Sequence, residues 1–130
     1  MLTNPKRKIS YNIKSYKCDN SKPSWSSYLA SDWQGPNWYR ISPSIGTKIP
    51  TSPTKQRHCG TGASGWIDGP STPSSIGQII DSKVCFSIIK NDGKGDQCFE
   101  SVAIKIRNCG SYLLYYLPNT LGCWRGYCVE

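Results

Sequence analysis

The seven cysteines are the feature that most limits how this 130-residue chain can fold. They include no C-x-x-C pair, and His58 is the only histidine, so the sequence lacks the closely spaced ligand pairs of zinc fingers and ribbons. The cysteines therefore predict disulfides rather than a metal site. Because disulfides persist in oxidising compartments, they indicate a secreted protein or the extracellular face of the cell surface.

Four of the cysteines surround the clearest strand pattern, in the last third of the chain. Val102, Ile104 and Ile106 alternate with small or charged residues, which is the period of a half-buried strand. A turn-prone stretch follows, and the apolar run 112–117 ends before Pro118, which cannot donate to a sheet. We expect a β-hairpin with cysteines at its start, its turn and its end: Cys98, Cys109, Cys123 and Cys128.

The remainder of the chain predicts short strands separated by loops. Residues 37–41 and 65–70 each read as a short strand, and residues 76–89 as a strand pair or one bent strand. Residues 42–57 are a loop, and 91–96 a turn. No segment keeps a helical period over three turns, and the chain has 12 glycines and 9 prolines. The predicted fold class is mainly β: a small, disulfide-stapled antiparallel β module with little helix and long loops.

The positive charge is concentrated at the start of the chain. Through residue 22 there are six Lys or Arg residues against one Asp, so most of the net charge of +8 lies there. We expect residues 1–17 to be a basic, disordered leader and residues 18–130 to be a single domain. A basic segment can bind nucleic acid or acidic lipid. Since the rest of the chain is only mildly basic, a solvated tail is the simpler interpretation, and no nucleic acid is expected as a partner.

Targeting signals are missing from the sequence. The first residues lack the apolar segment of a signal peptide, and no stretch approaches the about 20 apolar residues of a membrane span. Because the cysteines indicate secretion, we expect the chain to be a fragment of a longer secreted protein, or a gene model that lacks its start.

Candidate chemistry is sparse. The NDGKGD stretch at 91–96 is similar to the start of a calcium loop, but Lys94 occupies a ligand position and Gln97 stands where that loop needs glycine. His58 beside Cys59 suggests a nucleophile with its base. Neighbours in a strand face opposite sides, however, so these two residues are not expected to form a catalytic pair. No phosphate-binding, zinc-protease or hydrolase motif occurs. We therefore expect no enzyme activity, no catalytic residue, no metal and no cofactor.

The aromatic residues leave two interpretations open. Trp33, Trp38, Tyr39 and Trp66 are possible binding aromatics, because exposed rings beside cations can stack on sugars or nucleobases. In a small β domain such rings more often fill the core. A sugar-binding platform requires at least two exposed, coplanar rings, so their exposure decides between the two.

Several motifs together resemble a known family. They are WYRI at 38–41, CGTGASGWIDGPSTPSS at 59–75, IDSKVC at 80–85, CGSYLLYYL at 109–117 and CWRGYC at 123–128. The chain is similar over about residues 18–128 to the eight-cysteine domain of uromodulin, the pancreatic secretory granule major glycoprotein and related zona-pellucida-type, von Willebrand D and EGF domain-containing proteins. The resemblance implies a β-rich, disulfide-stapled extracellular module without catalytic residues.

The resemblance implies a function in binding rather than catalysis. We expect a structural or protein-interaction module of a larger secreted or cell-surface glycoprotein, whose partners are other extracellular modules or proteins. The alternatives are a lectin-like or adhesion surface with a glycan ligand, built from exposed Trp and Tyr, and an intracellular basic nucleic-acid binder. Family glycosylation sequons fall on Asp68 and Tyr116, but this chain contains no N-x-[ST] sequon, so a role through an N-glycan is not implied.

The resemblance also implies a disulfide pairing. It pairs Cys59 with Cys128, Cys85 with Cys98, and Cys18 with Cys109. The family's partner for Cys123 lies upstream of WYRI, where this chain has Ser31, and one cysteine of a vicinal pair near Cys98 is also missing. With an odd cysteine count one thiol is left over. We expect Cys123 to be that free thiol, unless Cys18 takes the missing position.

Overall fold

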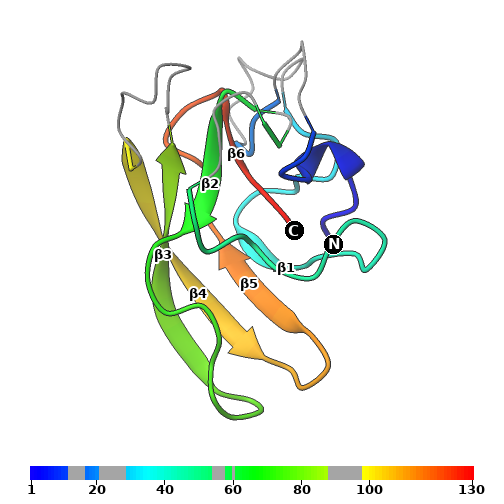
Figure 1. Cartoon of the computed structure of the whole chain (residues 1–130), viewed down its shortest axis with the longest axis vertical. Coiled ribbons are helices and arrows are strands. Elements are labelled where there is room, and N and C mark those ends of the chain that lie inside the picture. Colours follow the sequence, from blue (N-terminus) through cyan, green and yellow to red (C-terminus); the bar gives the residue numbers. More distant parts are fainter. Residues whose placement is uncertain (12–16, 21–28, 54–57, 60, 88–97) are drawn as a thin grey trace.

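The computed structural model describes residues 1–11, 17–20, 29–53, 58–59, 61–87 and 98–130. Their strands form one curled, six-stranded sheet with the order β1-β5-β4-β3-β2-β6 (Figure 1). Neighbouring strands are antiparallel except β2 and β6, which are parallel. The strands are β1 (Asn37–Arg40), β2 (Ala63–Ile67), β3 (Ile79–Ser87), β4 (Glu100–Asn108), β5 (Leu113–Leu117) and β6 (Arg125–Tyr127).

The predicted hairpin is confirmed and forms the middle of the sheet. Strand β4 buries Val102, Ile104 and Ile106 and exposes the residues between them, as the alternation predicts. It pairs with β5 on one side and with residues 79–86 of β3 on the other. Strand β5 directs Tyr115 and Leu117 to the same buried face. The mainly β fold class is therefore confirmed.

The shorter strands lie close to their predicted positions. The first spans 37–40 rather than 37–41, and the second begins and ends a few residues earlier than expected, at Ala63–Ile67. Residues 79–87 form one continuous strand rather than a pair. The predicted turn at 91–96 lies outside the described residues. Among the described residues the only helical element is the 3-10 turn η1 (Pro5–Arg7).

The core lies on the inner face of the curled sheet. Strand residues such as Tyr39, Val84 and Ile106 meet Ile45 and Ile49 from the loop after β1, which covers this face. The buried tyrosines keep their hydroxyls hydrogen-bonded. Tyr39 donates to the Gly35 carbonyl at 2.6 Å and Tyr127 to the Pro118 carbonyl at 2.7 Å. These bonds offset the cost of removing polar groups from water.

The N-terminal segment is part of the fold, so the prediction of a disordered leader is wrong for residues 1–11. Leu2 is fully buried and forms a parallel bridge with Ile41, while Lys8 bridges Val129 near the other end of the chain. The blue and red ends of the chain accordingly lie side by side (Figure 1). Composition suggested a solvated tail because single buried residues such as Leu2 leave no periodic pattern. Residues 12–16 lie outside the described residues.

All seven cysteines are described, and three disulfides join six of them. Cys59–Cys128 and Cys85–Cys98 form as the resemblance implied. The pairing of Cys18 with Cys109 and the free thiol at Cys123 are wrong, and the alternative in which Cys18 takes the missing position holds. Cys18 is bonded to Cys123, with Cα atoms 5.0 Å apart, and the free thiol is Cys109. The reason is the backbone pairing around Cys18, because the Asp19 amide donates to the Arg125 carbonyl and the Thr120 amide donates back to the Asp19 carbonyl. These bonds hold Cys18 beside the segment that contains Cys123.

Candidate interaction surface

The most extensive polar cluster is an internal clasp centred on Arg7. Its guanidinium makes two bonds to Asp32, at 2.9 and 2.6 Å, two to Asp19, both at 2.7 Å, and one to the Tyr127 carbonyl at 3.1 Å. Together these bonds use every N–H of the side chain, which is 5% exposed. Arg7 is therefore not available to a phosphate, contrary to what a basic tail would require.

The clasp also shifts the pKa values of Asp32 and Arg7. Burial alone would raise the pKa of Asp32, but hydrogen bonds and charge attraction from Arg7, with further bonds from the Asn4 and Thr3 amides, outweigh it and lower that pKa. Burial would lower the pKa of Arg7, yet its two carboxylate partners hold it above the usual range. Arg7 and Asp32 therefore stay ionised, and their bonds join the N-terminal segment to the domain.

The face of the sheet opposite the core carries a mixed apolar and cationic surface. Strand pairing aligns two rows of side chains across β1, β5, β4 and β3. Alternation places both rows opposite the buried tyrosines and isoleucines, and all members are partly or fully exposed. We call this surface the outer face: Trp38, Tyr116, Lys105 and Asp81 in one row, and Arg40, Leu114, Arg107 and Ile79 in the other.

The charges of the outer face are unevenly neutralised. Lys105 bonds Asp81 at 2.6 Å. Within the described part of the chain, neither Arg40 nor Arg107 has a carboxylate partner. The Arg40 guanidinium lies 4.0 Å from the centre of the Tyr112 ring, a cation–π geometry, and its buried Nε has no hydrogen-bond acceptor among the described residues. Tyr112 thus holds Arg40 in place, and no counter-charge comes from the described residues.

A groove of about 180 Å³ opens beside Arg40. It lies between the loop that follows β1 and the turn that joins β4 to β5, and Arg40 is its only charged lining residue among those described. Hydroxyl groups and apolar side chains make up most of the rest, including Pro43, Thr47, Ser111, Tyr112 and Leu113. A cationic pocket of this size holds one small anionic group rather than a large ligand.

Two of the four predicted binding aromatics are buried. Tyr39 is 2% and Trp66 8% exposed, and Trp66 donates its indole N–H to Ser87. Trp33 stacks on Tyr39 with ring centres 4.8 Å apart and packs against the core. For Tyr39 and Trp66 the prediction of an exposed binding ring is wrong, because both rings fill the interior of a small domain, whereas Trp33 is only partly buried.

Trp38 alone among them lies on the outer face. Its ring meets Tyr116 at 5.6 Å with an angle of 65° between the planes, so the two rings form an edge contact rather than a flat platform. A coplanar pair, which the lectin-like alternative requires, is not formed by these residues.

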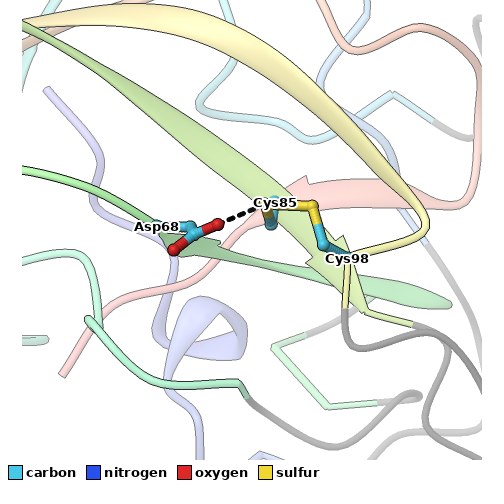
Figure 2. A group of neighbouring side chains, drawn as sticks. All are labelled: Asp68, Cys85 and Cys98. Atoms are coloured by element: carbon cyan, nitrogen blue, oxygen red, sulfur yellow. Dashed lines mark hydrogen bonds between the residues drawn. A yellow bond between two sulfur atoms is a disulfide. The ribbon is translucent and has the colours of Figure 1, made fainter.

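A second cluster combines Asp68 with the Cys85–Cys98 disulfide (Figure 2). Their ligand atoms lie within 4.8 Å of one another, and Cys85 Sγ is 3.6 Å from Asp68 Oδ2. A bonded sulfur is not a thiolate, so this disulfide offers no metal ligand while it is intact. Lys83 Nζ, 3.4 Å away, balances the carboxylate of Asp68.

His58 and Cys59 do not form a catalytic pair. His58 Nδ1 is hydrogen-bonded to the Ile9 carbonyl at 2.6 Å, and Cys59 is bonded to Cys128. Both residues instead hold the N- and C-terminal segments to the domain.

The residues that carry the outer face were not identified from the sequence, apart from Trp38. One signal was present for Arg40: in the strand 37–41 it alternates with Tyr39, and a buried Tyr39 places Arg40 on the opposite face. No sequence signal places Arg107 in the same row, because that depends on the pairing of β4 with β5.

The family comparison covers almost the whole sheet. Residues 39–129 match the sequence profile of the uromodulin-like eight-cysteine domain. The match includes β2 to β6 and part of β1, while Cys18 and the Arg7 clasp lie before it. No helix in the described residues is long and apolar enough to cross a membrane. The three disulfides and the β-rich sheet fit an extracellular module of a glycoprotein. This chain therefore belongs to the family of uromodulin-like eight-cysteine domains.

Proposed function

We propose that the chain is a structural and protein-interaction module of a larger secreted or cell-surface glycoprotein, and that it binds its partner through the outer face. The observation that carries this proposal is the composition of that face. Trp38, Tyr116 and Leu114 lie partly exposed beside two arginines that have no carboxylate partner among the described residues. Trp, Tyr and Arg are the residues that most often dominate the binding energy of protein interfaces.

The proposal assigns binding and no catalytic step. The buried carboxylates of Asp19 and Asp32 are both bonded to Arg7, and His58 and Cys59 serve structural contacts. None of these groups is positioned beside the groove as an acid, a base or a nucleophile. A stable scaffold with one open face is the arrangement that a recognition module needs.

An array of purified extracellular domains, probed with the oxidised full chain, tests the proposal. We expect binding to a limited set of domains, and its loss when Trp38→Ser and Leu114→Ser remove apolar contact from the outer face. Leu121→Ser is the matched control, because Leu121 is 65% exposed and lies in the loop between β5 and β6, outside the outer face.

Two results would contradict the proposal. Binding that survives the Trp38→Ser and Leu114→Ser substitutions would place the interaction elsewhere on the chain. Chemical conversion of a bound domain, detected by mass spectrometry after incubation, would show a catalytic rather than a binding role.

A further inference from the structure

We infer that the groove beside Arg40 receives the carboxylate of an acidic peptide segment in the partner protein, while apolar side chains of the same segment cover the outer face. This inference rests on the proposed function and specifies the chemistry of the partner. The partner segment is a peptide that carries Asp or Glu next to aromatic or aliphatic residues.

The first support is the unbalanced charge of Arg40. Its guanidinium is the only charged group among the described residues of the groove, has no carboxylate among them, and has a buried Nε without an acceptor. Stacking on Tyr112 at 4.0 Å fixes the plane of the guanidinium before a ligand arrives. A carboxylate matches a planar guanidinium better than any other side-chain group does, because it can accept two parallel hydrogen bonds.

The second support is the continuity between the groove and the outer face. Arg40 is directly opposite Leu114, and Leu114 is opposite Arg107 on the next strand. The backbones of the two arginines are therefore about 10 Å apart, which is twice the spacing of neighbouring strands. A segment whose acid enters the groove would cross Leu114 and place its following residues near Trp38, Tyr116 or Arg107.

The geometry of the rings favours a peptide over an acidic sugar. Trp38 and Tyr116 meet at 65°, so they do not offer the flat stacking surface that a sugar ring requires. One face of the Tyr112 ring is already covered by Arg40. Tilted rings beside the aliphatic side chain of Leu114 instead suit the side chains of an extended peptide.

Selection from a random 12-residue peptide display library, using the oxidised full chain as target, tests the inference. We expect the recovered peptides to share an Asp or Glu beside an aromatic or aliphatic residue. Fluorescence anisotropy then gives the dissociation constant of a selected peptide and of its counterpart with the acid changed to Asn or Gln.

Removing either member of the charge pair should have the same effect. Arg40→Gln in the protein, or the amide in the peptide, should weaken binding by roughly 10- to 100-fold, the usual loss for a hydrogen-bonded charge. Making both changes should add little further, because the pair has already been broken. Lys6→Gln, which removes one exposed positive charge outside the sheet, should leave the dissociation constant within about twofold.

Two further variants separate a binding role from a folding role. Arg40→Lys keeps the charge but loses the planar fork, so it should bind with intermediate affinity. Ser111→Trp keeps Arg40 and fills the groove from the exposed turn, so it should also abolish acid-dependent binding. Thermal unfolding of each variant should match that of the parent chain.

Several outcomes would overturn the inference. These are selected peptides without an acid, equal losses for Arg40→Gln and Lys6→Gln, or preferential binding of sialylated or sulfated oligosaccharides tested as probes in parallel. If Trp38→Ser with Leu114→Ser abolishes binding to the domain array but Arg40→Gln does not, the inference fails and the proposed function stands. If neither change affects binding, both fail.

Discussion

Replacing Arg7 by Met should destabilise the domain more than any other single change to an exposed or terminal segment. The side chain is 5% exposed and neutralises two carboxylates that are 1% and 5% exposed. Met has a similar length and no charge, so the substitution removes the clasp while retaining most of the buried volume.

The expected loss follows from what remains in the interior. Within the described residues, Asp19 would keep the Tyr127 amide, and Asp32 the amides of Thr3 and Asn4, as hydrogen-bond donors to a full negative charge. Leaving a buried charge without its partner costs about 3–5 kcal/mol. The total stability of a domain of this size is about 5–15 kcal/mol. With a urea m value of about 2 kcal/mol/M, the midpoint should fall by about 2 M.

Urea unfolding at pH 7, followed by far-ultraviolet circular dichroism with the disulfides intact, measures the effect. Lys6→Met is the matched control, because Lys6 is adjacent and exposed, and it should change stability by less than about 0.5 kcal/mol. Adding Asp19→Asn and Asp32→Asn to Arg7→Met should recover part of the loss, since amides keep an acceptor without a charge.

The pH dependence of the free energy of unfolding is a second test of the same clasp. The folded pKa of Asp32 is lowered below its ordinary value of 3.8. Its contribution to stability is therefore complete above about pH 4 and is lost as the pH falls through the folded pKa. The difference between the parent chain and Arg7→Met should shrink correspondingly in acid. A loss below about 1 kcal/mol at pH 7, or a triple variant no more stable than Arg7→Met, would refute the clasp as described.

Three further predictions concern the cysteines and a buried tyrosine. Iodoacetamide labelling of the native protein followed by peptide mass analysis should modify Cys109 and no other cysteine; label on Cys123 would contradict the observed pairing. Replacing Cys18 and Cys123 together by Ala should cost about 4–5 kcal/mol, against about 3 kcal/mol for the shorter Cys85–Cys98 loop, in paired urea titrations. Burial raises the pKa of Tyr115 to about 12, so the domain should lose stability as the pH rises above about 10, and Tyr115→Phe should flatten that alkaline loss in thermal melts.

The central hairpin could be predicted because its information is local. In β4 each buried residue is separated from the next by one exposed residue, so a window of nine residues contains the whole pattern. The turn between β4 and β5 is also encoded locally, because its turn-prone residues are consecutive in the sequence. The resemblance added two disulfides to this picture, because their cysteines lie within motifs that the family shares.

The clasp and the outer face could not be predicted for the opposite reason. Arg7 is joined to residues 12, 25 and 120 positions away in the sequence. In the sequence, a buried arginine bonded to two acids looks the same as a solvated one in a basic tail. The partner of each outer-face residue likewise depends on strand order, since β1 pairs with β5 and not with its neighbour in sequence.

The position of the unpaired thiol follows from the same nonlocal contacts. Cys109 and Cys123 lie beyond opposite ends of β5, Cys109 in the turn that precedes the strand and Cys123 in the segment that follows it. The residue next to Cys18 bonds to residues 120 and 125, which flank Cys123, so Cys18 reaches Cys123 and not Cys109. Cys109 is left unpaired two residues from Ser111, which lines the groove. The disulfide at one end of the strand therefore leaves a free thiol near the proposed binding site at the other.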